Sequence, residues 1–136
     1  MEDRSIILDK LASVEFIKFI SKFNISTVVA FGSICNGGFN ELSDVDIALL
    51  GKNKILLDSI LDIELFLERF LERQIDVVDL RSDTLDLFIK INILNSGKVI
   101  YSADNNQLFE SFCDETDRIY KENKNFMYFR RGDVLS

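Results

Sequence analysis

Two aspartates stand one residue apart in the segment "DVDIALLG", residues 44–51, whose other side chains are almost all apolar. If this segment is a β-strand, Asp44 and Asp46 lie on one face, with Cα atoms about 6.5–7 Å apart. Two carboxylates at that spacing can share one divalent cation or bridge two. The ordinary alternative is a pair of surface charges on the solvent face of an antiparallel sheet.

A third carboxylate is available in the segment "QIDVVDL", residues 74–80. Asp76 lies in the middle of the predicted strand, where a charged side chain has few structural roles. Asp79 points to the opposite face of the strand and lies near its end. We therefore expect Asp76 to join Asp44 and Asp46. Converging carboxylates repel one another unless they find a partner, and Mg²⁺ prefers oxygen ligands. The three aspartates are the predicted metal ligands.

Gly32 and Ser33 directly follow the apolar segment "ISTVVAF", residues 25–31. A strand that ends in Gly-Ser and continues into a short helical turn presents backbone N–H groups, which can hold phosphate oxygens. Gly32 lets a phosphate approach the backbone closely, and the Ser33 hydroxyl can donate a hydrogen bond to it. Taken alone the dipeptide is an ordinary turn, so a nucleotide-binding role is predicted only together with the aspartates.

Other motifs for phosphate or metal binding are missing from the sequence. No G-x-x-x-x-G-K-[ST] occurs, and no G-x-G-x-x-G follows a strand. An EF-hand loop at Asp44 and Asp46 fails because Ala48 stands at a ligand position and Leu49 at the glycine position. The chain has no histidine, which excludes histidine-based nucleophile systems, histidine general bases and most transition-metal sites.

The composition bounds the class of protein. With 136 residues, 47% of them hydrophobic, the chain is expected to form a single domain over residues 1–136. The net charge of −7 argues against direct nucleic-acid binding but allows a phosphorylated ligand held through a divalent cation. No apolar run approaches the ~18 residues of a membrane span, and the charged N-terminus lacks a signal-peptide core, so we expect a cytoplasmic protein without membrane contact. Cys35 and Cys113 are expected to be free thiols.

Apolar spacing and turn residues predict the secondary structure. Asp83 is the expected N-cap and Gly97 the expected end of one helix. Together the elements predict an α/β (α+β) fold in which helices pack on a small mixed β-sheet. The expected helices cover residues 5–23, 54–72, 83–95 and roughly 105–122, and the expected strands residues 25–31, 44–51, 74–80 and, at a sheet edge, 98–102.

The C-terminal segment "NKNFMYFRRGDVLS" is ambiguous. Phe126, Tyr128 and Phe129 lie next to Arg130 and Arg131 in this segment. This mixture fits a segment that docks a partner, and it fits better a C-terminal helix that packs on its own domain. The apolar stripes of the helices are interpreted as core, and a homodimer face is not distinguishable from them.

The spacing of Gly32-Ser33, ten residues, then Asp44-x-Asp46 resembles the G-S-x10-D-x-D signature of the DNA polymerase β-like nucleotidyltransferase superfamily. "QIDVVDL" resembles the strand that carries the third carboxylate of that superfamily and matches it with Asp76. "ILNSGKVIYS" resembles a later segment of the minimal nucleotidyltransferases (MNT). The resemblance covers roughly residues 25–101 and implies a fold like the palm of polymerase β.

The resemblance also implies a function. Small proteins of this kind are similar to antitoxins that accompany HEPN-family ribonuclease toxins. In that branch the antitoxin transfers AMP from ATP to a tyrosine hydroxyl of the toxin and so silences it. It implies that Asp44, Asp46 and Asp76 are catalytic as well as metal-binding, with Mg²⁺ as cofactor and ATP as substrate. The implied partner is a cognate HEPN-type toxin, in an assembly that is either a homodimer or a hetero-oligomer with the toxin.

The sequence departs from the family pattern at Asn36, which stands where many members carry an arginine. One cation that contacts phosphates or the partner is therefore missing, whereas the metal ligands are intact. Lys52, Arg81, Lys90 and Arg130 are candidates for the basic group that neutralises the triphosphate, and the sequence does not choose among them.

Two other functions stay open. An antitoxin that neutralises its toxin by contact alone, with a weak or silent site, is disfavoured by the three intact aspartates and favoured by Asn36. A nucleotidyltransferase that acts on a small hydroxylated molecule, of the aminoglycoside type, is disfavoured because the short chain leaves little to form an acceptor pocket.

Overall fold

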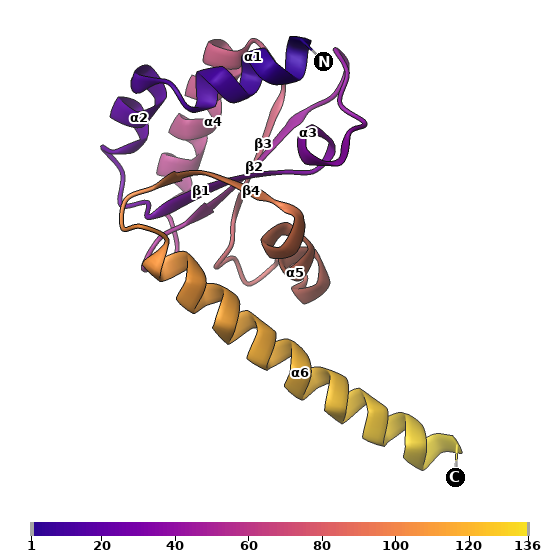
Figure 1. Cartoon of the computed structure of the whole chain (residues 1–136). Coiled ribbons are helices and arrows are strands. Elements are labelled where there is room, and N and C mark those ends of the chain that lie inside the picture. The colour runs from indigo at the N-terminus through magenta and orange to yellow at the C-terminus, as the bar shows by residue number, and fades with distance from the viewer. Residues whose placement is uncertain (1, 136) are drawn as a thin grey trace.

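The computed structural model describes the backbone of residues 2–135 and the side chains of residues 4–122. Four strands form one sheet in the order β3-β2-β1-β4. Figure 1 shows this sheet between helices, with the last helix extending away from it. The strands are β1 (Thr27–Phe31), β2 (Val45–Leu50), β3 (Ile75–Asp79) and β4 (Lys98–Ser102). The helices are α1 (Glu2–Leu11), α2 (Val14–Ile20), α3 (Ser33–Asn36), α4 (Leu57–Leu71), α5 (Leu87–Ser96) and α6 (Gln107–Leu135).

The sheet is mixed, as the sequence predicts. Strand β1 pairs antiparallel with β2 and with β4, whereas β2 and β3 are parallel. A parallel neighbour requires a crossover connection, and helix α4 supplies it between β2 and β3. The expected strand at 98–102 is confirmed as an edge strand.

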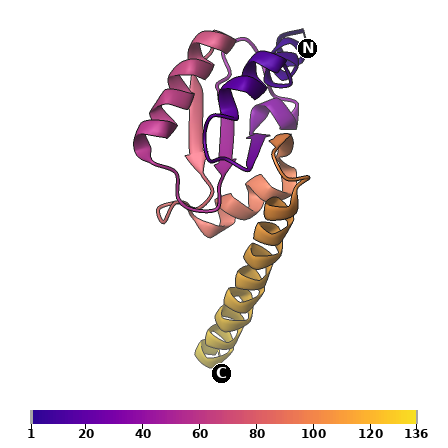
Figure 2. The same ribbon diagram turned by 90° about the vertical axis from the view of Figure 1, so that its left-hand side faces the viewer.

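Helices cover both faces of the sheet, which explains the continuous apolar runs in the central strands. On one face, Val28 and Ile47 pack in a core cluster with residues of α1, α2 and α4. On the other face, Val29 and Ala48 pack in a second cluster with residues of α5 and α6, including Phe112. Figure 2 shows these helix layers on either side of the strands.

The expected helix over residues 5–23 is wrong in one respect, because it is two helices. Helix α1 ends at Leu11 and α2 begins at Val14, with Ser13 as its N-cap. Ser13 has extended backbone, and its hydroxyl accepts a hydrogen bond from the Phe16 N–H. A serine side chain that satisfies a free N–H group favours a helix start, and here it overrides an apolar spacing that continues across the break.

Helix α5 begins later than the sequence predicts. Asp86, not Asp83, is its N-cap and accepts a hydrogen bond from the Phe88 N–H. Asp83 instead pairs with Lys54 on the surface. Gly97 ends the helix as expected, and its N–H donates to the Ile93 carbonyl.

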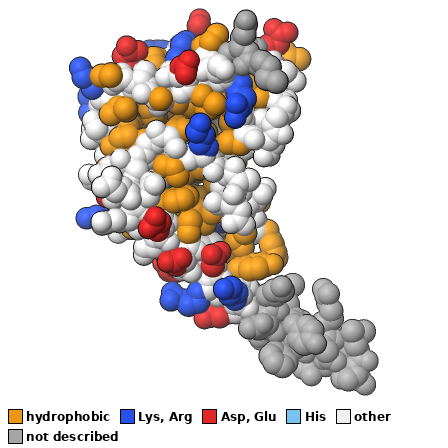
Figure 3. Space-filling model, in the orientation of Figure 1, with side chains coloured by type: hydrophobic (Ala, Val, Ile, Leu, Met, Phe, Trp, Pro, Cys, Tyr) orange, Lys and Arg blue, Asp and Glu red, His pale blue; other side chains and the backbone are white. Residues whose placement is uncertain are grey.

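Helix α6 begins close to its expected start but runs to Leu135, well beyond the expected end. Figures 1 and 2 show its later part leading away from the sheet. The interpretations of Phe126, Tyr128, Phe129, Arg130 and Arg131 concern side chains outside the described ones. Within the part of the chain that the structure describes, no helix is long and apolar enough to cross a bilayer. On the face shown in Figure 3, acidic and basic side chains lie interspersed around a band of hydrophobic ones.

Candidate functional site

The register of the parallel strands brings two of the candidate aspartates together. Asp46 of β2 and Asp76 of β3 are Cα partners, so their side chains lie on the same face of the sheet. Neighbouring strands are about 4.8 Å apart, which lets the two carboxylates interact directly. Asp44 lies one residue before β2. Asp46 is half-buried, whereas Asp44 and Asp76 are exposed.

The turn after β1 lies directly against the Asp46 carboxylate. Gly32 has a φ of 79°, in the region that favours glycine. A Cβ at this position would overlap Oδ2 of Asp46 and lie 3.2 Å from its Cγ. Gly32 is therefore required both by its backbone conformation and by the close approach of Asp46. Phe31, the preceding residue, is the Cα partner of Asp46 in the antiparallel pair.

The Asp46 carboxylate is disfavoured by its burial and by its acidic neighbours. Burial raises the pKa of Asp46 above its usual value, and the charges of Asp76 and then Asp44 raise it further. A hydrogen bond with the Asp76 side chain acts in the same direction. Asp46 is therefore the carboxylate on which the charges of the other two aspartates act.

The donor chemistry of the three aspartates fits a hard divalent cation. Carboxylate oxygens are the ligands that Mg²⁺ prefers, and a cation would relieve the repulsion that raises the Asp46 pKa. Among the described residues, no group of three or more Asp, Glu, His or Cys side chains is arranged so that it could hold a metal ion, so the ligand set would have to close around the ion when it binds. Asp79 takes no part, because it is buried at the other end of β3 and accepts hydrogen bonds from the Ile55 and Arg81 N–H groups.

The short helix α3, which follows Gly32, is fixed by an arginine that the sequence analysis did not identify. Arg4 of α1 donates from Nε to the Ile34 carbonyl at 2.6 Å. Ile34 is buried in the core, and Gly37 ends α3 in the left-handed conformation. Ser33 is the first residue of α3, half-buried beside Gly32. Nothing in the sequence pattern links Arg4 to a carbonyl 30 positions away.

A second arginine missed by the sequence analysis holds the segment that leads into Asp44. Arg73 donates from Nη1 to the carbonyls of Asn40 and Ser43, at 2.8 Å each. Its guanidinium lies over the Phe39 ring, 4.6 Å from the ring centroid. These contacts tie the loop before β2 to the connection between α4 and β3.

The basic residues proposed from the sequence differ in their position relative to the aspartates. Lys52 and Arg81 are near the end of β2 that is opposite to Asp46, and Arg81 donates to the Gly51 carbonyl. Five residues of strand separate Asp46 from Gly51, about 16 Å. Lys90 lies over the Phe112 ring, on the face covered by α5 and α6. This places Lys52 and Arg81 away from the aspartates. Lys90 lies on the sheet face that Asp46 shares with Ala48 and stays a candidate, and the Arg130 side chain is outside the described ones.

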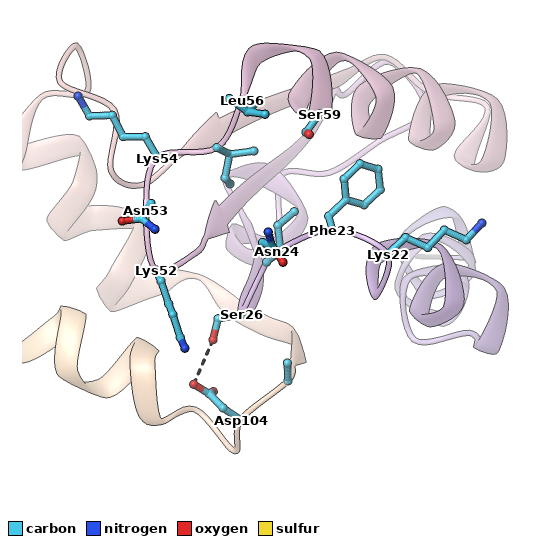
Figure 4. Close-up of a pocket in the computed structure, with 13 residues that line it drawn as sticks. Lys22, Phe23, Asn24, Ser26, Lys52, Asn53, Lys54, Leu56, Ser59 and Asp104 are labelled. Atoms are coloured by element: carbon cyan, nitrogen blue, oxygen red, sulfur yellow. Dashed lines mark hydrogen bonds between the residues drawn. The ribbon is translucent and has the colours of Figure 1, made fainter.

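A cavity of about 680 Å³ lies at the same far end of the sheet (Figure 4). It is bounded by the connections before β1, after β2 and after β4. In Figure 4 Lys22 points away from it, and Asp104 is hydrogen-bonded to Ser26. Lys54 is paired with Asp83. The three candidate aspartates are not among the residues that line this cavity, and we place the candidate site at the aspartates.

Comparison with known proteins bears on the family and the fold of the chain. Residues 15–106 match the family model described as "Polymerase beta, Nucleotidyltransferase". Similar folds occur in a toxin–antitoxin structure with AMP-PNP (22% identity, 90% of this chain and 97% of that chain, TM-score 0.69). They also occur in a tri-AMPylated Shewanella oneidensis HEPN toxin in complex with MNT antitoxin (19%, 98% and 99%, 0.66) and in the toxin–antitoxin MntA-HepT (20%, 90% and 95%, 0.63). A search of curated proteins gave no match.

Proposed function

Because the chain belongs to the polymerase β nucleotidyltransferase family, we propose that it transfers AMP from ATP to a tyrosine hydroxyl of a cognate HEPN ribonuclease toxin. In this proposal the transfer silences the toxin, and the chain is its antitoxin. Family membership supports nucleotidyl transfer. Two solved structures of similar fold support the antitoxin role: a toxin–antitoxin with AMP-PNP, and a tri-AMPylated HEPN toxin in complex with an MNT antitoxin.

The observation that carries the proposal is the pairing of Asp46 with Asp76 directly beside the Gly32 turn. Nucleotidyl transfer needs a place for the phosphates and a cluster of carboxylates that holds metal against them. The structure brings a glycine turn and acidic side chains together from three elements that are distant in sequence. This supports Asp44, Asp46 and Asp76 as metal ligands and Gly32 and Ser33 as phosphate contacts.

The exposed position of two of the carboxylates supports a macromolecular acceptor. Asp44 and Asp76 are open to solvent, so a hydroxyl on a partner's surface can reach them. The cavity of the described residues lies at the opposite end of the sheet and is far from the aspartates. The charge of −7 also suits a ribonuclease partner, because a protein that binds RNA presents a basic surface.

In the proposed mechanism the chain positions groups and compensates charge. Asp44, Asp46 and Asp76 would hold Mg²⁺, which would supply positive charge to the phosphates of ATP. Gly32 permits close approach of the phosphates, and Ser33 donates a hydrogen bond to a phosphate oxygen. Asp76 accepts the proton of the tyrosine hydroxyl while the tyrosine oxygen bonds to the α-phosphorus. The bond from the α-phosphorus to the bridging oxygen breaks, and pyrophosphate leaves.

The proposal is tested by the intact mass of the cognate toxin after incubation with this protein, ATP and magnesium. The toxin is sought first as the product of the neighbouring gene. We expect a mass gain of one or more AMP units with the wild-type chain and none with Asp46→Asn. A toxin Tyr→Phe variant identifies the acceptor.

Two results would contradict the proposal. Labelling by Asp46→Asn at the wild-type rate would remove Asp46 from the site. An unmodified toxin whose ribonuclease activity is nevertheless suppressed would instead establish an antitoxin that acts by contact alone.

A further inference from the structure

We propose that Arg73 is a positioning residue for the candidate site, because it fixes the backbone beside Asp44 and so sets Asp44 against Asp46 and Asp76. Nothing in the motif pattern assigns a role to this arginine. The inference rests on the proposed function only in taking the aspartates as metal ligands. The hydrogen bonds of Arg73 to the backbone beside Asp44 are present in the chain without metal or nucleotide.

The loop before Asp44 is ordered by its own side chains and then attached by Arg73. The Asn40 N–H donates to the Ser43 hydroxyl, and the Asn40 side chain accepts from the Leu42 N–H. The Ser43 N–H donates to the Asn40 carbonyl. Arg73 donates to the carbonyls of Asn40 and Ser43, which are the first and last residues of this turn. The turn is therefore held as a unit against the start of β3.

The residue after Arg73 holds the other side of Asp44. The Val45 N–H donates to the Gln74 carbonyl at 3.0 Å. Arg73 and Gln74 are thus hydrogen-bonded to Ser43 and Val45, the two neighbours of Asp44 in the chain. Strand β3 begins at the next residue, Ile75, and carries Asp76. One short segment therefore fixes the backbone of the first carboxylate and carries the third.

This attachment opposes the repulsion within the acidic cluster. Asp44 and Asp46 carry like charges and are separated by a single residue, so the two carboxylates favour moving apart. Asp44 is exposed and lies outside the β2 ladder, so its own side chain has little packing to resist that movement. Hydrogen bonds from a charged donor are stronger than neutral ones, which suits Arg73 to this task.

The chemistry of the contact favours arginine over lysine. The planar guanidinium lies over the Phe39 ring while it donates to two carbonyls. Phe39 itself packs against the main core cluster, so the ring is a fixed platform. A lysine ammonium is a point charge without a flat face and reproduces only part of this geometry.

The test compares Arg73→Ala with Arg73→Lys and with Arg69→Ala. Arg69 is an exposed arginine of α4, close in sequence, and its removal changes the net charge equally. The first readout is hydrogen exchange of the backbone amides of residues 40–46 in protein free of metal and nucleotide. We expect faster exchange in Arg73→Ala and wild-type exchange in Arg69→Ala.

The second readout is a calorimetric titration of AMP-PNP binding at a series of magnesium concentrations. Removal of a residue that orients a metal ligand typically weakens metal affinity about tenfold or more, so Arg73→Ala should need about ten times more magnesium. Arg73→Lys should need an intermediate concentration, and Arg69→Ala the wild-type concentration. Arg73→Lys keeps the charge and serves as the test if Arg73→Ala does not fold.

The outcomes separate this inference from the proposed function. If Arg73→Ala and Arg73→Lys match Arg69→Ala in exchange and in magnesium requirement, the positioning role is wrong. A lower thermal midpoint with an unchanged magnesium requirement would also overturn it, because it would show a purely structural arginine. If the wild-type chain shows no magnesium-dependent binding of AMP-PNP, the proposed function fails. Hydrogen exchange of residues 40–46 then still tests whether Arg73 fixes the backbone beside Asp44.

Discussion

Gly32 and Asp46 depend on each other at the scale of single residues. The glycine adopts a backbone conformation that side chains rarely tolerate, and it does so where the Asp46 carboxylate leaves no room for a Cβ. The sequence argument gave Gly32 a single role, close approach of a phosphate. The structure adds a second one, because the glycine also accommodates a carboxylate of the same site.

Gly32→Ala is therefore expected to damage both stability and the site. The strained conformation should cost about 1–3 kcal/mol in the free energy of unfolding, measured in urea. Displacement of Asp46 should also abolish magnesium-dependent nucleotide binding. Gly38→Ala is the matched control, because nothing lies within 4 Å of a Cβ there, and it should leave both quantities unchanged. Wild-type nucleotide binding by Gly32→Ala would refute the close contact.

The aspartates illustrate what sequence reasoning can and cannot reach. Alternation along a strand cannot show that β2 and β3 are neighbours or in which register they pair. The structure pairs Asp46 with Asp76, whereas Asp44 lies one residue before β2 and outside the paired residues. The contacts of Arg4 and Arg73 were out of reach, since each side chain bonds to carbonyls about 30 positions away. No periodicity or motif encodes such a pairing.

At the scale of elements, local side-chain chemistry decides where the helices begin. Apolar spacing runs through Ser13 without interruption, so periodicity alone predicts one long helix, whereas the Ser13 hydroxyl starts a new one. Asp83 and Asp86 both suit an N-cap, and only tertiary contacts separate them, because Asp83 is drawn to Lys54. The strands were predictable because runs buried on both faces must be apolar throughout.

Helix α3 should depend on Arg4 for its position. Arg4→Ala removes the hydrogen bond to the Ile34 carbonyl and loosens the helix that begins at Ser33. We expect ATP-analogue affinity at saturating magnesium to fall about three- to tenfold, as for loss of one hydrogen bond. Arg118→Ala, an exposed arginine of α6, should bind normally. Equal affinities of the two variants would show that α3 holds its place without Arg4.

The start of α6 should be sensitive to acid through Asp104. Burial raises the pKa of Asp104, but hydrogen bonds from the Leu108 N–H and from Ser26 and Ser102 outweigh it and lower the pKa below 3.8. A lowered pKa in the folded state means stability that is present above pH 3.8 and is lost as the pH falls further. Asp104→Asn should therefore be less stable than the wild type at neutral pH, with a difference that shrinks in acid.

Urea unfolding between pH 7 and pH 3 measures this difference. Asp9→Asn, at an exposed aspartate of α1, controls for the general loss of a negative charge. A constant difference between Asp104→Asn and wild type across the pH range would show that the carboxylate charge does not stabilise the junction of β1, β4 and α6.

At the scale of the whole molecule, the two ends of the sheet carry different groups of side chains. One end gathers the aspartates and the Gly32 turn, and the arginines there bond to backbone carbonyls. The other end holds the cavity of Figure 4, which is lined by lysines and asparagines and by Asp104, hydrogen-bonded to Ser26. Because the exposed aspartates lie at the first end, we expect the acceptor to be presented there by a partner, with the described domain serving as a platform.

The central claim is that Asp46 and Asp76 act together in binding metal and nucleotide. The most direct measurement is a calorimetric titration of AMP-PNP with and without magnesium, for wild type, Asp46→Asn, Asp76→Asn and the exposed-helix control Asp62→Asn. The account predicts magnesium-dependent uptake by wild type and Asp62→Asn, and none by the other two. Nucleotide uptake by wild type that ignores magnesium, or uptake by Asp46→Asn and Asp76→Asn equal to wild type, would contradict it.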